Sequence, residues 1–172
     1  GHTATSSAVS KLEVVGGKPV SFEVLADDEG AMEEQAHRLA AWGKNVFVKI
    51  PISTCNGGST MGLLARLTSM GVKVNVTAVM TPLQVALACA ALKTPGNIIS
   101  VFAGRIADTR LDPEPLVTAA SVIVRAKGQQ LLWASAREVF NVVQAERSGA
   151  HIITLTPELI AKLDLKGKEL FK

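Results

Sequence analysis

The sequence predicts an α/β fold built on one parallel sheet, and three features of the chain lead to that prediction. Short apolar runs alternate with segments of helical period, which is the order that right-handed strand–helix–strand crossovers produce. The runs are apolar at most positions, as expected of strands that helices cover. The length of 172 residues suits a single domain with a real core.

Six apolar runs are the predicted strands, and they recur at intervals of about 25 residues. They are rich in β-branched and aromatic residues, which is typical of strands. In chain order they span Val20–Leu25, Val46–Ile50, Val72–Val76, Ile98–Phe102, Gln130–Ala134 and His151–Leu155.

Helical periodicity is clearest in Met32–Trp42, Leu83–Leu92 and Leu116–Ala126. Proline fits the first turn of a helix, and prolines stand at three expected starts: Pro82, Pro113 and Pro157. A left-handed helix cap favours glycine, and glycines follow four expected helices: Gly43, Gly71, Gly128 and Gly149. An open doubly wound sheet and a (β/α)8 barrel both fit this order of elements.

The composition argues against several classes of protein. Hydrophobic residues make up 48% and charged residues 19%, which is typical of a globular domain. A net charge of +3 without a basic tract, and 4% aromatic residues, argue against a nucleic-acid surface. The longest apolar stretch, Val85–Leu92, is too short to cross a bilayer, so no membrane is expected. Cys55 and Cys89 lie far apart, which favours a reducing, cytoplasmic location.

The motifs predict neither a cofactor nor a metal. No glycine-rich dinucleotide or phosphate loop follows a predicted strand, and Gly57-Gly58 lacks the lysine and the spacing of such a loop. His37 and His151 are interpreted as structural residues. Asp27-Asp28-Glu29 is interpreted as an acidic helix start, which the helix dipole favours.

Lys49 is the most informative single residue, because it stands near the end of a predicted buried strand. Lysine is rarely buried unless it has a partner or a task. Desolvation disfavours the ammonium form, so a lysine in this setting becomes a nucleophilic amine, as a Schiff-base enzyme requires. The alternative is a lysine whose stem lies along the strand while its ammonium reaches water.

Other polar residues stand in or just after predicted strands, where the chemistry of a (β/α)8 barrel gathers. Glu23 lies in the first strand, and Asn75 and Thr77 are two residues apart in the third, so they share a face. The remaining candidates are Ser100, Arg105, Ser135 and Arg137. Each alone has a structural explanation, such as an ion pair between Arg105 and Asp108. Their shared placement favours a binding site.

These residues fall in motifs that resemble the transaldolase family, which includes small fructose-6-phosphate aldolases. The motifs, specific only in combination, are Ser21-Phe22-Glu23-Val24, Val48-Lys49-Ile50-Pro51, Val74-Asn75-Val76-Thr77, Ser100-Val101-Phe102-Ala103-Gly104-Arg105-Ile106 and Ala134-Ser135-Ala136-Arg137. The resemblance implies a (β/α)8 TIM barrel. About six of its eight βα units are visible, in a single incomplete barrel domain over residues 1–172.

The resemblance also implies a function: transfer of a dihydroxyacetone unit between sugar phosphates through a Schiff base on Lys49. Glu23 and Thr77 would hold a catalytic water, while Asn75 and Ser100 would contact the ketose. Phe102 would line the substrate site, and Arg105, Ser135 and Arg137 would hold the phosphate, which suits the planar fork of arginine. We expect sugar-phosphate substrates, a homo-oligomer, no metal and no cofactor.

Two positions favour transfer over simple aldol cleavage. The aldolase branch of the family tends to carry Gln where this chain has Glu23, and Tyr where it has Phe102. Phe102 offers no hydroxyl to position a water that would release the three-carbon unit. A fructose-6-phosphate-type aldolase is the alternative.

Two strands that the resemblance implies are not visible in the sequence. The family carries an acid/base Asp at the end of its first strand and an Asn in its second, whereas Val20–Leu25 aligns with the third. Residues 1–18 contain one carboxylate, Glu13, and relatives add another helix after Phe171-Lys172. Three explanations fit this gap. The chain is part of a longer protein, or it is a truncation completed by another chain, or it is a non-catalytic relative that binds sugar phosphates. We favour the first.

Overall fold

The computed structural model of the protein describes residue 12 and residues 14–165, and its centre is a sheet of six parallel strands. The strands are β1 (Val20–Glu23), β2 (Val46–Pro51), β3 (Val74–Val79), β4 (Ile98–Val101), β5 (Gln130–Trp133) and β6 (Ile152–Ile153). They pair in chain order, and every pair is parallel. The order never reverses, which contradicts the doubly wound alternative. The six strands form a half-barrel, consistent with part of a TIM barrel.

All six predicted strands are confirmed, although their ends differ from the prediction. β2 includes Pro51, and β3 begins two residues later than predicted and continues to Val79. β4 stops at Val101, so Phe102 lies just beyond the strand and not inside it. β6 is reduced to two residues.

Helices connect the strands as the alternating pattern predicts. They are α2 (Glu29–Ala40), α3 (Met61–Ser69), α4 (Pro82–Ala91), α5 (Ala103–Asp108), α6 (Glu114–Ala126), α7 (Asn141–Arg147) and α8 (Pro157–Lys162), followed by a 3-10 turn, η1 (Leu163–Leu165). α2 begins three residues before the predicted Met32, because Asp28 caps it and accepts a hydrogen bond from the Ala31 N–H at 2.9 Å.

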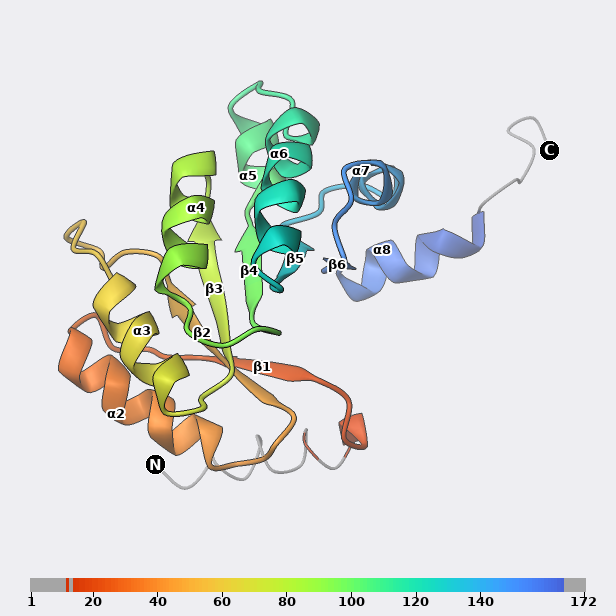
Figure 1. Ribbon diagram of the computed structural model, residues 1–172. Coiled ribbons are helices and arrows are strands. Elements are labelled where there is room, and N and C mark those ends of the chain that lie inside the picture. The colour runs from red at the N-terminus through yellow and green to blue at the C-terminus, as the bar shows by residue number, and fades with distance from the viewer. Residues whose placement is uncertain (1–11, 13, 166–172) are drawn as a thin grey trace, which may run out of the picture.

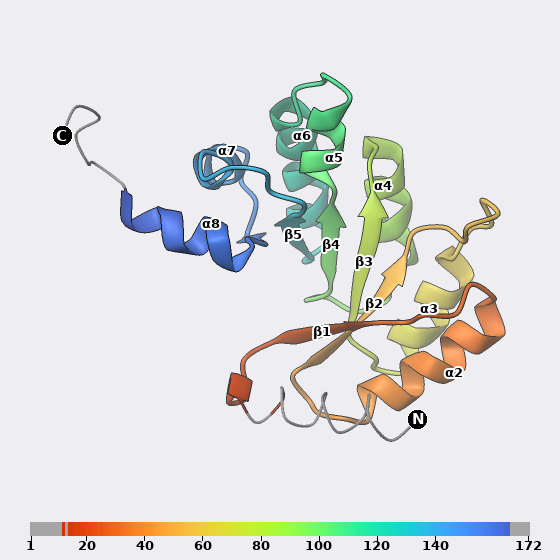
Figure 2. The ribbon, with the colours of Figure 1, turned by 180° about the vertical axis from the view of Figure 1, so that it is seen from behind.

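The two faces of the sheet have different environments (Figures 1 and 2). Helices α2, α3, α4 and α6 lie along one face, and in the reverse view the strands stand in front of α4 and α6. Outward strand residues such as Val48, Val76 and Trp133 are buried with helix residues such as Leu64 and Val117 in the main core.

The inner face carries a smaller apolar cluster, formed by Phe47, Ile98, Leu132 and Ala134. Phe102 and Ile152 pack against it. The alternation of strand side chains thus divides the sheet into an outer, helix-covered core and an inner face on which polar side chains are also present.

One predicted glycine cap is wrong. Gly71, Gly128 and Gly149 have φ of 80°, 66° and 76°, the left-handed region that follows many helices. Gly43 does not, because α2 ends at Ala40 and the residue that caps it is Ala41, with φ of −67°.

Glu13 and the end of the chain at Phe171-Lys172 lie outside the described residues. Within the described part, no helix is long and apolar enough to cross a membrane.

Candidate active site

The inner face of the half-barrel contains a cavity of about 410 Å³ that brings together three of the predicted site residues, Lys49, Asn75 and Ser100. They come from β2, β3 and β4, and the parallel register places Lys49 beside Asn75. The complete lining is Pro19, Val20, Ser21, Lys49, Asn75, Ser100, Leu132, Ala134 and Thr154. The polar lining residues thus come from β1 to β4 and from Thr154 after β6, whereas the lining beside β5 is apolar.

Lys49 has the partner that its position calls for. Its Nζ lies 3.6 Å from Oε2 of Glu23, the last residue of β1, and the two residues are paired in the register of the sheet. The Lys49 side chain is 29% exposed and that of Glu23 is 49% exposed. An amine and a carboxylate thus face each other at the rim of the cavity, where an incoming molecule can reach both.

Asn75 is held in a chain of hydrogen bonds that crosses the sheet. The Ser100 hydroxyl donates to Asn75 Oδ1 at 2.7 Å, and Asn75 Nδ2 donates to Ser21 Oγ at 3.1 Å. Asn75 and Ser100 are almost completely buried. These two hydrogen bonds fix the orientation of the Asn75 amide, because its oxygen and its nitrogen each have one partner.

Thr77 shares the face of Asn75 in the register of β3, where it pairs with Pro51. Its side chain is 1% exposed, and its Oγ1 has no hydrogen-bond partner among the described residues. A buried hydroxyl without a partner carries a desolvation cost, so Thr77 departs from the rule that buried polar groups are hydrogen-bonded.

A β-bulge follows Thr77 directly. Between Val76 and Val79 the pairing with β4 slips by one residue, and Ala78 has a φ of 59°. The extra residue turns Val79 outward into the helix-covered core, where it is fully buried. Bulges often re-aim side chains beside active sites, and here the bulge ends the inner-facing run at Thr77.

The predicted phosphate residues come from the segments that follow β4 and β5. Arg105 lies within α5, the short helix that follows β4, and its guanidinium carbon is 5.6 Å from the centre of the Phe102 ring. Ser135 follows β5 directly and has a φ of 62°. Neither arginine nor Ser135 lines the inner cavity.

The structural alternative for Arg105, an ion pair with Asp108, is not found among the described residues. Arg137 Nη2 lies 2.6 Å from Asp108 Oδ2, so Asp108 instead joins the end of α5 to the segment after β5. The backbone N–H of Arg137 donates to Asn141 Oδ1 at 2.7 Å, which fixes the start of α7 against the same segment.

Three residues at the site were missed from the sequence. Ser21 stands two residues before Glu23 and so shares its face, a signal that was available. Thr154 follows β6, a strand too short to indicate which side chains face inward. Asp108 was considered only as a possible partner of Arg105, and its contact with Arg137 was missed.

Neither cysteine is placed to act as the nucleophile. Burial raises the pKa of the Cys89 thiol to about 11. A hydrogen bond to Asp27 raises the pKa of the exposed Cys55, whose backbone N–H also donates to Asp27 Oδ1 at 2.7 Å. Among the described residues, no three His, Cys, Asp or Glu side chains come together in a way that could hold a metal ion.

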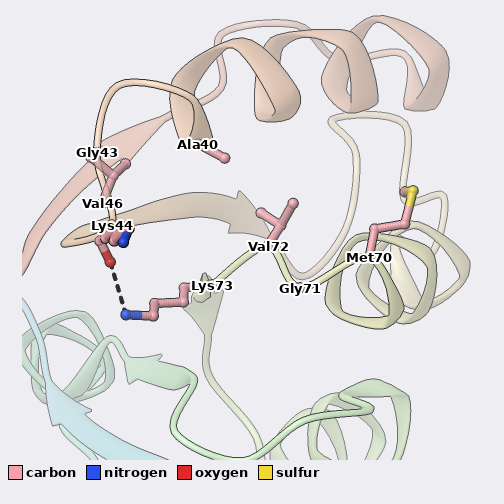
Figure 3. Close-up of a pocket in the computed structure, with 8 residues that line it drawn as sticks. All are labelled: Ala40, Gly43, Lys44, Val46, Met70, Gly71, Val72 and Lys73. Carbon is pink, nitrogen blue, oxygen red and sulfur yellow. Dashed lines mark hydrogen bonds between the residues drawn. The ribbon is translucent and has the colours of Figure 1, made fainter.

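A second hollow of about 430 Å³ lies at the opposite end of the strands, where β2 and β3 begin (Figure 3). Lys73 Nζ donates to the Lys44 carbonyl at 2.8 Å, and Ala40, Val46 and Val72 supply apolar walls. Its lining includes none of the predicted site residues. Lysines here lie after the carboxyl ends of α2 and α3, where the helix dipole favours positive charge.

Comparison with known proteins matches nearly the whole chain. Residues 4–171 match the family described as Transaldolase/Fructose-6-phosphate aldolase. A "Probable transaldolase" of Symbiobacterium thermophilum is 33% identical over 154 residues, which cover 88% of this chain and 68% of that protein. A "Probable transaldolase" of Streptococcus equi subsp. equi is 36% identical over 155 residues, which cover 88% of this chain and 68% of that protein.

Among solved structures, the chain is similar to the Bacillus subtilis YkuI protein, with an EAL domain, in complex with substrate c-di-GMP and calcium. The TM-score is 0.52 and the sequence identity is 16%, over 77% of this chain and 35% of that chain. The chain thus spans about a third of the YkuI protein, and at this identity the similarity concerns the fold alone.

Proposed function

The chain belongs to the transaldolase/fructose-6-phosphate aldolase family, and from that premise we propose that it transfers a dihydroxyacetone unit between sugar phosphates through a Schiff base on Lys49. The observation that carries the proposal is the pairing of Lys49 with Glu23 at 3.6 Å, at the rim of a cavity that Asn75 and Ser100 also line. An amine, a carboxylate, an amide and a hydroxyl on one face are the groups that this chemistry requires.

The reaction begins when the neutral Lys49 amine attacks the ketone carbon of a ketose phosphate. Glu23 is the nearest group to take the proton that the amine gives up, directly or through a water. The proton that Glu23 took returns to the carbinolamine hydroxyl, which leaves as water, and an iminium remains. Glu23, through a water, is then proposed to take the proton of the hydroxyl on the fourth carbon, while the bond between the third and fourth carbons breaks and the iminium accepts its electrons. The aldehyde departs, and a three-carbon enamine remains on Lys49.

Transfer completes the cycle. The enamine carbon attacks the carbonyl carbon of an acceptor aldose phosphate and re-forms an iminium, and water then releases the new ketose and the free amine. Thr77 is proposed to hold the water that moves protons together with Glu23, because its buried hydroxyl has no other partner among the described residues. Asn75 and Ser100 are proposed to bind the hydroxyl groups of the ketose.

The phosphate is assigned to Arg105, Ser135 and Arg137, which lie beyond the inner cavity on the segments after β4 and β5. Both arginines are exposed, so an anion can reach them from solvent. A guanidinium can donate two parallel hydrogen bonds to phosphate oxygens, and this geometry supports the assignment.

Phe102 supports transfer over aldol cleavage. Its ring lies between Arg105 and the inner apolar cluster, and it carries no hydroxyl that could hold a water near the enamine. An enamine shielded from such a water persists until an acceptor arrives. A fructose-6-phosphate-type aldolase would instead release free dihydroxyacetone.

The test is to supply the protein with fructose 6-phosphate, with and without an acceptor aldose phosphate, and to follow the products by chromatography. We expect a new ketose phosphate only when the acceptor is present. Release of dihydroxyacetone at the same rate without an acceptor would replace transfer by aldolase activity. Binding of the sugar phosphate without either product would leave a non-catalytic relative.

A further inference from the structure

We infer that Gly104 and Asp108 are positioning residues, which hold the segments after β4 and β5 together as one preformed anion-binding unit. The inference rests on the proposed function, because it concerns the groups assigned to the substrate phosphate. Neither residue is assigned a contact with the substrate. Gly104 acts through the backbone of its neighbours, and Asp108 acts through Arg137.

Gly104 is the point at which the backbone after β4 meets the backbone after β5. Its N–H donates to the Ala134 carbonyl at 3.2 Å. A Cβ built on Gly104 would lie 1.6 Å from the carbonyl oxygen of Ser135 and 2.7 Å from its carbonyl carbon. These are backbone atoms, which cannot give way as the end of a flexible side chain can. Only glycine therefore permits the approach, and Arg105 is the next residue along the chain.

Ser135 carries a backbone conformation that its own side chain does not favour. Its φ of 62° lies in the left-handed region, which is costly for a residue with a Cβ. Strain of this kind persists where surrounding contacts over-determine it, and it gathers at functional sites. Two contacts do so here: the approach of Gly104, and the hydrogen bond from the Arg137 N–H to Asn141.

Asp108 makes the second connection between the two segments. Its Oδ2 accepts from Arg137 Nη2 at 2.6 Å, and both side chains are 54% exposed. An ion pair with this exposure contributes little to stability, and a carboxylate at the end of α5 is unfavourable to the helix dipole. The effect that remains is orientation of Arg137, whose other N–H groups stay free to donate to an anion.

The inference predicts that anion binding depends on these two residues even though neither touches the anion. Titration of the protein with inorganic phosphate, followed by 31P NMR, measures that binding without any turnover. We expect Gly104→Ala to weaken phosphate binding roughly tenfold or more, because misplacing a positioned group by an ångström has effects of at least that size. The matched control is Gly62→Ala in α3, where an added Cβ would lie 3.4 Å from its nearest neighbour, Arg66 Nη1.

Asp108 gives a test that does not depend on a buried substitution. Asp108→Ala removes the acceptor and should weaken phosphate binding about twofold to fivefold, the range of an exposed ion pair. Asp108→Asn keeps an acceptor oxygen for Arg137 and should bind phosphate at least as tightly as the unchanged protein. If the Asp108 carboxylate acted only by repelling the anion, Asp108→Ala and Asp108→Asn would both bind phosphate more tightly than the unchanged protein, which would contradict the positioning role.

Turnover supplies a second readout. Gly104→Ala and Asp108→Ala should raise KM for fructose 6-phosphate by a larger factor than KM for fructose, which lacks the phosphate. The inference is overturned if Gly104→Ala and Asp108→Ala both bind phosphate as tightly as the unchanged protein. It is also overturned if the unchanged protein does not bind phosphate. Normal phosphate binding without any transfer would overturn the proposed reaction alone and leave the positioning role intact.

Discussion

Lys49 Nζ and Glu23 Oε2 lie 3.6 Å apart on neighbouring strands whose register places the two residues side by side. A pair this exposed adds little to the free energy of unfolding. In the proposed mechanism the pair has a chemical role, because it places a proton acceptor beside the amine that must lose a proton before it can attack a carbonyl.

Glu23→Gln removes that acceptor and keeps the size of the side chain. We expect kcat for transfer to fall about 100-fold or more, the effect of losing a positioned acid–base group. The free energy of unfolding should change little. Steady-state kinetics check this, with Glu146→Gln, an exposed glutamate of α7, as the control; equal kcat values in the two variants would remove Glu23 from the mechanism.

Thr77→Val should separate stability from activity. Valine has the shape of threonine but no hydroxyl, and the Thr77 hydroxyl is buried without a partner among the described residues. We expect the free energy of unfolding to rise by about 1 kcal/mol, because a desolvated polar group is removed. If Thr77 holds a catalytic water, kcat should fall in the same variant. Urea unfolding and steady-state kinetics measure the two effects, and a variant that is less stable but fully active would contradict the assignment.

Asn75→Ala breaks the hydrogen-bond chain at its centre. The Ser100 hydroxyl, which is 1% exposed, then loses its acceptor at 2.7 Å. We expect the free energy of unfolding to fall by about 2 kcal/mol, the cost of leaving a buried polar group unpaired. Asn56→Ala, in the exposed loop after β2, is the control in the same denaturation experiment. A loss no larger than the control's would mean that the chain Ser100–Asn75–Ser21 does not stabilise the sheet.

Glu33 should contribute to the acid sensitivity of the fold. Hydrogen bonds from Arg66, at 2.9 Å to Oε2, hold the pKa of Glu33 below its ordinary value. Since that pKa is lower in the folded chain than in the unfolded chain, the stabilisation is present above the ordinary glutamate pKa. It is lost as the pH falls through the folded value.

The measurement is the free energy of unfolding as a function of pH for Glu33→Gln and for the unchanged protein. The two curves should differ at neutral pH and converge at acid pH. Glu34→Gln, at a neighbouring exposed position of α2, is the control. A constant difference between the curves at all pH values would contradict the ion-pair origin of the effect.

Local sequence signals were sufficient for the sheet and for three residues that line the inner cavity, Lys49, Asn75 and Ser100. Apolar runs of strand length identified all six strands, and the two-residue period placed Asn75 and Thr77 on one face. Lys49 was identified because lysine is rarely found in an apolar, buried strand unless it has a partner or a task. These are properties of a residue and its near neighbours, which is why the sequence alone carries them.

Contacts between distant segments could not be predicted in the same way. Nothing near Ala78 in the sequence indicates a left-handed residue, since the bulge depends on how β3 must meet β4. Arg137 pairs with Asp108 across 29 residues, whereas from the sequence the nearer Arg105 was the only partner considered for Asp108. The role of Gly104 appears only once the backbone of Ser135 is beside it.

The central claim is that Lys49 carries the substrate, and reductive trapping tests it most directly. The protein is incubated with fructose 6-phosphate and borohydride, digested, and examined by peptide mass spectrometry. We expect a reduced three-carbon adduct on the peptide that contains Lys49. The adduct should be absent from Lys49→Arg, whose guanidinium stays protonated, and should persist in Lys73→Arg, at the opposite end of the strands. An adduct on another lysine, or equal trapping in Lys49→Arg, would contradict the account.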